Sequence, residues 1–139
     1  MQRSCIPVIA AYDKMGGAQP NVNEQLINKM LTDSHREWDE ECMDVFTHYE
    51  ATECLKNKKP RVLYISYGET DEWAHSEKYY YYLNAAHQMD AWLKEIWDFV
   101  QSDAQYKNKT TILITTDHGR GGLKKETWTS HGQKVEDSD

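Results

Sequence analysis

The sequence predicts an α/β fold in which a parallel β-sheet is flanked by helices. Three short segments, 6–12, 61–67 and 110–116, are rich in β-branched and aromatic residues and are bounded by turn-forming or charged residues, as buried strands are. Helical patterns separate the three segments. A strand, a long helix and another strand, in this order, predict a right-handed crossover and therefore parallel strands.

Three helices are expected in the segments between these strands. Residues 21–31 place their apolar side chains on one face. A second helix ends near Lys56, and it begins either in a capping-box pattern at Ser34 or at Asp39 as N-cap. The longest helix is predicted over 76–103, where apolar residues recur every three or four positions.

Composition and charge narrow the class of protein. The chain has 139 residues, which fits one domain, and a hydrophobic content of 39% suits a globular protein. Its formal net charge of −7 argues against a nucleic-acid-binding footprint. No stretch is long and apolar enough to read as a transmembrane helix or a signal peptide. Cys5, Cys42 and Cys54 suggest neither a disulfide framework nor a thiolate metal site, so the compartment is undetermined.

Five residues with metal-binding side chains follow the second and third predicted strands. Asp71 and His75 are four residues apart, a spacing that puts both on one face of a helix. Asp117 and His118 are adjacent, and the glycines behind them permit a sharp turn. His131 comes back in a short loop. Since ligands gather at the carboxyl ends of parallel strands, we expect these five side chains to converge at one edge of the sheet.

Two carboxylates and three imidazoles suit zinc or a similar divalent ion. Two histidines and one aspartate make a three-ligand site with an open position, as a catalytic ion requires. A second ion, held by Asp117 and His118, would form a two-metal clamp for displacement at phosphorus or sulfur.

The motifs "GETDEWAH", "TTDHGRGG" and "WTSHG" resemble the three C-terminal metal motifs of the alkaline phosphatase superfamily, and the resemblance covers roughly residues 39–132. That group includes phosphatases, sulfatases, nucleotide phosphodiesterases and cofactor-independent phosphoglycerate mutases. The resemblance implies that Asp71, His75 and His131 bind a first metal ion, and that Asp117 and His118 bind a second. It implies two zinc ions, with manganese as the alternative.

The sequence departs from the family pattern at its catalytic nucleophile. The family has a further metal-binding Asp near its first strand, followed by a Ser or Thr that attacks the ester. Asp13 follows a strand-like segment but has no such Ser or Thr behind it. The chain is therefore expected to be a single partial domain, truncated at both ends, that lacks the nucleophile.

Four residues near the metal motifs have predicted supporting roles. Arg120 and Lys124 are expected either to orient a phosphate or sulfate group or to be solvated loop charges. Glu69 and Thr70 are expected to orient the aspartate ligand that follows them. Asp44 shows no functional spacing.

The function predicted from these motifs is a metal-dependent hydrolase of phosphate or sulfate esters, with little or no turnover by this chain alone. Two alternatives remain open: a non-catalytic metal-binding or interaction module, and a phosphotransferase similar to phosphoglycerate mutase. Self-association through an exposed sheet edge is also expected.

Overall fold

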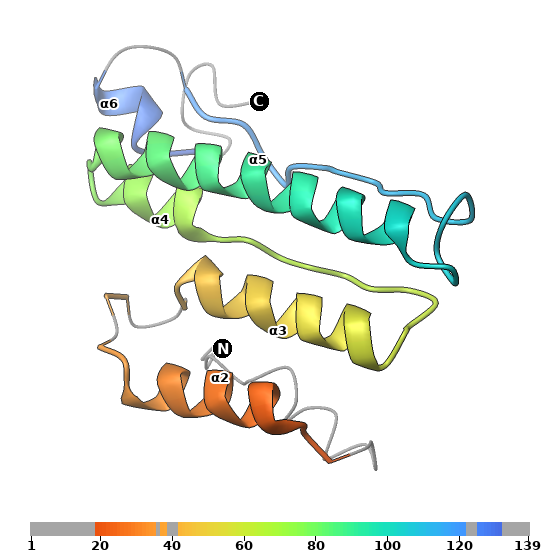
Figure 1. Ribbon diagram of the computed structural model, residues 1–139. Coiled ribbons are helices and arrows are strands. Elements are labelled where there is room, and N and C mark those ends of the chain that lie inside the picture. The colour runs from red at the N-terminus through yellow and green to blue at the C-terminus, as the bar shows by residue number, and fades with distance from the viewer. Residues whose placement is uncertain (1–18, 36, 39–41, 122–124, 132–139) are drawn as a thin grey trace. The chain divides into compact units, whose positions relative to one another are not determined.

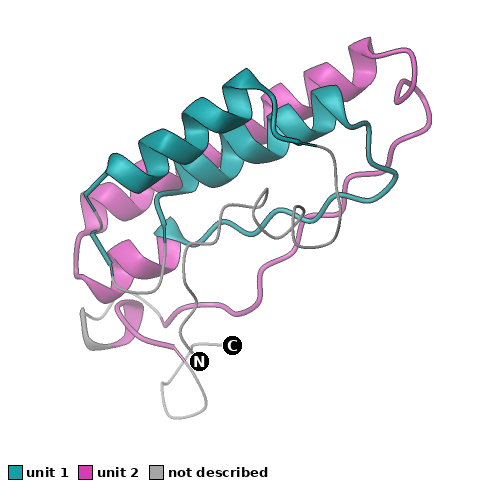
Figure 2. Ribbon diagram, turned by 90° about the horizontal axis from the view of Figure 1, so that it is seen from below, with its two compact units in different colours: residues 1–69 teal, residues 70–139 magenta. Residues whose placement is uncertain are grey.

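The computed structural model of the chain describes residues 19–35, 37–38, 42–121 and 125–131. The chain divides into two compact units, Met1–Glu69 and Thr70–Asp139 (Figure 2). The described residues form helices α2 (Val22–Asp33), α3 (Asp44–Asn57), α4 (Glu69–His75), α5 (Tyr79–Ser102) and α6 (Lys125–Trp128) (Figure 1).

The predicted α/β fold with a parallel sheet is wrong for this structure. No strand is present among the described residues, and segments 61–67 and 110–116 have no regular secondary structure (Figure 1). Val62 is 86% exposed and Leu113 is 88% exposed, although both were expected in a buried sheet. A strand requires a neighbour for its N–H and C=O groups, and residue preference alone does not supply one. The remaining predicted strand, 6–12, lies outside the described residues.

The first unit contains α2 and α3, which pack against each other. A capping box starts α2: the Asn21 carboxamide accepts the Glu24 N–H at 3.0 Å, and the Glu24 carboxylate accepts the Asn21 N–H at 2.6 Å. The Lys58 ammonium, just beyond α3, lies 3.0 Å from the Glu24 carboxylate. The structure confirms both helices but moves one boundary, because α3 begins at Asp44 and Ser34 is the C-cap of α2.

The second unit begins at Thr70, the second residue of α4, and also contains α5 and α6. The long helix predicted over 76–103 is confirmed as α5, and Trp92, Ile96 and Val100 are its buried residues. The Trp73 ring on α4 stacks on the Tyr81 ring on α5, with centroids 4.8 Å apart. This contact and the short connection between the two helices hold α4 against the start of α5.

None of the helices in the described ranges combines the length and the apolar character needed to cross a membrane. These ranges also hold no sheet edge, so the structural basis expected for self-association is absent from them. Exposed apolar side chains remain on the extended segments, at Val62, Tyr64, Leu113 and Ile114. Self-association itself stays a prediction.

Candidate metal centre

Helix α4 places the first two predicted ligands side by side. Asp71 and His75 are one helical turn apart, and the Asp71 Oδ2 atom lies 3.4 Å from His75 Nε2. Side chains four residues apart share a helix face. The spacing argument made on the sequence is therefore confirmed by the structure.

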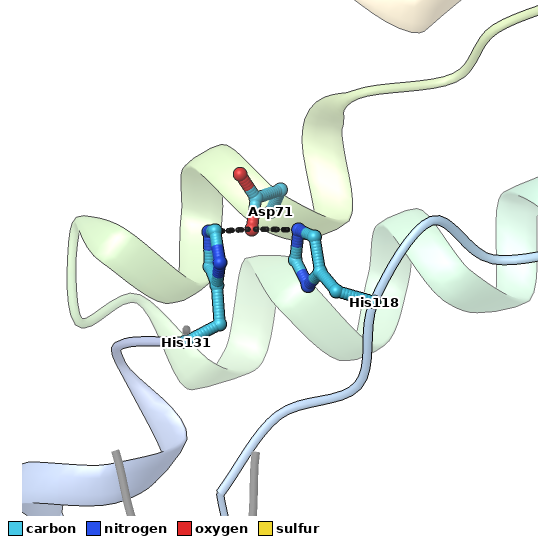
Figure 3. Close-up of side chains that lie close together, drawn as sticks. All are labelled: Asp71, His118 and His131. Atoms are coloured by element: carbon cyan, nitrogen blue, oxygen red, sulfur yellow. Dashed lines mark ion pairs between the residues drawn. The ribbon is translucent and has the colours of Figure 1, made fainter. Parts of the chain in front are cut away.

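Two further histidines reach the same carboxylate from other parts of the second unit. His118 follows the extended segment 110–116, and its Nε2 lies 3.6 Å from Asp71 Oδ1. His131 follows α6, and its Nε2 lies 3.5 Å from the same oxygen. Figure 3 shows the Asp71 carboxylate between these two imidazoles. Three segments far apart in the sequence thus converge on one oxygen atom.

A close backbone contact holds the loop of His118 near α6. A Cβ atom added at Gly121 would lie 2.5 Å from both Cβ and the carbonyl oxygen of Thr127. No side chain fits at that distance, so Gly121 is required here for close approach. The sequence interpretation stressed the turning freedom of these glycines, whereas the structure shows a packing requirement at Gly121.

The three imidazoles form a compact group. The His118 and His131 rings are stacked, with centroids 3.6 Å apart and planes inclined by 15°. His131 Nε2 also lies 3.1 Å from His75 Nε2. Desolvation lowers the pKa of His131, and the charges of His118, His75 and Arg120 lower it further. A neutral imidazole is the form that binds a metal, so this environment favours the ligating form of His131.

Arg120 supplies a positively charged side chain next to Asp71. Its side chain is only 13% exposed, and the guanidinium pairs with Asp71 Oδ1. It also donates to the Asp71 carbonyl at 2.9 Å and to the Trp128 carbonyl at 3.3 Å. Arg120 therefore fastens α4 to the end of α6 and neutralises the Asp71 carboxylate. The other predicted substrate contact, Lys124, lies outside the described residues, as does Asp13.

Asp117 stands apart from the other predicted ligands. Its side chain is 89% exposed. One carboxylate oxygen accepts the N–H of His118 at 3.0 Å, and the other lies 3.7 Å from His118 Nε2. The resemblance pairs His118 with Asp117 in a second metal site, whereas in the structure His118 gathers with Asp71 and His131.

The donor set and its spacing fit one divalent metal ion. One ligand atom each from Asp71, His118 and His131 lies within 4.8 Å of the others. Metal bonds of about 2.0–2.1 Å in tetrahedral geometry place neighbouring ligand atoms about 3.3 Å apart. The distances between ligand atoms around Asp71 and His131, from 3.1 to 3.6 Å, lie close to that value. Small shifts would therefore complete a site with three or four protein ligands.

Of the two residues expected to orient Asp71, Glu69 has a definite partner that the sequence did not indicate. Its carboxylate accepts the backbone N–H of Asp44, which lies 25 residues earlier. Asp44 was assigned no role. Its place before an apolar helical pattern, where carboxylates favour the first turn, was the available signal.

Comparisons with known proteins agree with the character of this centre. The model of one protein family, described as the metalloenzyme superfamily, matches residues 9–135. Searches of curated proteins and of solved structures gave no significant match.

Proposed function

Because the chain belongs to the metalloenzyme superfamily, within the alkaline phosphatase superfamily, we propose that its Asp71 centre binds a divalent metal ion and serves the cleavage of phosphate or sulfate esters. The family match covers most of the chain, from residue 9 to residue 135. This match agrees with the family resemblance of the three sequence motifs. Membership of this family implies that the protein binds metal. The ester substrate is our own extension.

One observation supports the proposal above the others. Nitrogen atoms of His118 and His131 approach the same oxygen of Asp71 from two loops that are distant in sequence. A carboxylate that only stabilises a turn needs one hydrogen-bond partner. A carboxylate that binds a metal ion lies beside other ligand atoms, which surround the same point. The additional approach of His75 Nε2 to Asp71 Oδ2 gives the group a fourth candidate ligand.

The proposed chemistry assigns separate roles to the residues of the centre. A bound ion would supply positive charge for the oxygens of the transferred group and would lower the pKa of a coordinated hydroxyl or water. Asp71 and the imidazoles would hold the site, with the pKa of His131 lowered by burial and by the neighbouring positive charges. Arg120 would bind the anionic oxygens of the ester, because a guanidinium matches phosphate and sulfate with paired donors.

Zinc is the proposed ion and manganese the alternative, because imidazole and carboxylate ligands suit both. The resemblance assigns His118, together with Asp117, to a second ion, and that assignment is the alternative to the grouping of His118 with Asp71 and His131. The Ser or Thr nucleophile expected in the family mechanism has no counterpart that we identify in this sequence. We therefore propose ester cleavage for the complete site and expect little or no turnover from these 139 residues alone.

Metal content of the purified chain tests the proposal directly. We expect about one equivalent of zinc or manganese by mass spectrometry after loading and removal of free ions. The double variant Asp71→Ala, His75→Ala should lose it. His87→Ala is the matched control, because it removes an exposed imidazole of α5 and leaves the centre intact.

A second assay separates the candidate functions. Hydrolysis of an aryl phosphate or an aryl sulfate by the loaded chain would support the hydrolase and identify the preferred ester. Metal binding without turnover is expected from this chain under the hydrolase and under the non-catalytic module alike, so binding of inorganic phosphate or sulfate to the loaded chain separates them. A hydrolase site binds the anion, and the module does not. A folded chain that retains no metal would refute the proposed function.

A further inference from the structure

The buried face of α3 has a polar end. Asp44, His48, Ala51 and Leu55 are all buried and recur at helical spacing along this helix. Ala51 and Leu55 are apolar, as expected for a core-facing stripe. Asp44 and His48 are polar, and the Asp44 residue is only 4% exposed. A buried carboxylate needs hydrogen-bond donors, so its partners indicate its role.

The partners of Asp44 are the backbone groups at the beginning of α4. Asp44 Oδ1 accepts the Gly68 N–H at 2.8 Å, and Asp44 Oδ2 accepts the Glu69 N–H at 3.0 Å. In return, Glu69 Oε1 accepts the Asp44 N–H at 2.6 Å. The first residue of α3 and the first residue of α4 thus satisfy each other's free donors. We call these three bonds the Asp44–Glu69 clasp.

His48 adds a fourth attachment one turn further along α3. Its Nδ1 atom lies 3.0 Å from the Tyr67 hydroxyl, and His48 is fully buried. Three consecutive residues, Tyr67, Gly68 and Glu69, are therefore fastened to one face of α3. The segment before them, 62–66, has no regular structure. The residues that lead into α4, up to and including its first residue Glu69, are therefore held by α3.

We propose that Asp44 is a positioning residue for the metal ligand Asp71. This inference rests on the proposed function, because it takes Asp71 as a ligand. Asp71 lies two residues after Glu69 on the same short helix, so a shift in the helix start moves the carboxylate directly. Loss of a partner that orients a ligand commonly costs 10–100-fold in metal affinity. A carboxylate in the clasp is suited to this task, since its charge strengthens both bonds that it accepts.

The competing explanation is that the clasp only stabilises the fold. Both explanations predict a lower unfolding midpoint when the clasp is removed, because two buried N–H groups lose their acceptors. They differ in metal affinity measured well below the unfolding transition. A structural role leaves the affinity of the folded protein unchanged, whereas a positioning role lowers it.

The experiment measures zinc affinity by competition with a chelating dye, together with the denaturation midpoint, for the full chain and three variants. Asp44→Asn keeps the size of the side chain but replaces one acceptor with a donor. We expect it to lower zinc affinity about tenfold or more, with one equivalent still bound at saturation. Leu55→Ala is the control: it destabilises the same buried face but leaves the clasp intact, and we expect its affinity to stay within about twofold of wild type.

Glu69→Gln examines the clasp from its other side and keeps the Asp44 carboxylate. We expect a smaller loss, about threefold, since only the bond to the Asp44 N–H is weakened. If Asp44→Asn does not fold, the zinc affinity of Glu69→Gln tests the inference instead. Wild-type affinity in the folded clasp variants would overturn the inference alone, as would an equal loss in Leu55→Ala. Absence of zinc binding by the wild-type chain would overturn the inference together with the proposed function.

Discussion

The imidazole rings of His118 and His131 stack 3.6 Å apart, and each ring directs a nitrogen toward the same oxygen of Asp71. This relationship groups His118 with His131 rather than with its sequence neighbour Asp117. It matters for the proposed function because it determines which residues would hold the first metal ion. The sequence motifs alone assign the two histidines to different ions.

Single substitutions distinguish the two groupings. We expect His118→Ala and His131→Ala each to lower zinc affinity more than about 100-fold, beyond the effect of an outer partner, whereas Asp117→Ala should cost less than about tenfold. The reason is that Asp117 is almost fully exposed and that its contact partner, within the part of the chain that the structure describes, is the adjacent histidine. Titration calorimetry with zinc measures all three, with His87→Ala as control. If Asp117→Ala abolishes binding as completely as His118→Ala does, the grouping by motif is correct.

The difference between sequence and structure has a physical basis in this chain. The pairing of Asp71 with His75 and the extent of α5 follow from helical periodicity, which is local, and both were predicted. The sheet was predicted from β-branched residues at 61–67 and 110–116, but strand pairing is a long-range property that composition does not determine. The clasp between Asp44 and Glu69 spans 25 residues and likewise could not be read from spacing.

Arg120 provides a second prediction, because its guanidinium and a metal ion compete for Asp71 Oδ1. We expect Arg120→Gln to raise zinc affinity by about fivefold, since an ion pair of this kind is worth up to about 1 kcal/mol. The same substitution should weaken binding of inorganic phosphate to the zinc-loaded chain, because it removes the cationic fork.

Calorimetry of zinc binding, followed by calorimetry of phosphate binding, measures both effects of Arg120→Gln. Arg120→Lys is the control, since it keeps the charge but not the paired donors. Weaker zinc binding by Arg120→Gln would contradict the competition and would assign Arg120 a supporting role in holding Asp71.

Gly121 gives a third prediction, which concerns the packing behind the centre. An added methyl group would lie 2.5 Å from backbone and side-chain atoms of Thr127. We expect Gly121→Ala to reduce the free energy of unfolding by about 1–3 kcal/mol, as overpacking does, and to weaken zinc binding by moving the His118 loop. Chemical denaturation and zinc titration measure the two effects. Thr127→Ser should not rescue the variant, because serine keeps the Cβ, carbonyl carbon and carbonyl oxygen atoms that the added methyl group meets; a full rescue would refute this explanation.

Glu50 gives a prediction about pH that does not involve the metal centre. Burial, reinforced by the nearby Glu24, raises the pKa of Glu50 from 4.5 to about 7, and no described residue forms a hydrogen bond with its Oε1 atom. Below pH 4.5 the carboxyl is protonated in both the folded and the unfolded chain. As pH rises toward 7 the unfolded chain releases this proton first, so stability falls, and the loss is complete above pH 7.

The difference between the two pKa values corresponds to roughly 3 kcal/mol of stability at pH 8. We therefore expect Glu50→Gln, which is neutral at every pH, to stabilise the chain at pH 8 and to have little effect at pH 4.5. Denaturation midpoints of wild type and variant at the two pH values measure this difference. Glu95→Gln, at an exposed position of α5, is the control for replacing a glutamate by a glutamine. Equal effects of Glu50→Gln at both pH values would mean that Glu50 ionises as easily in the folded chain as in the unfolded one.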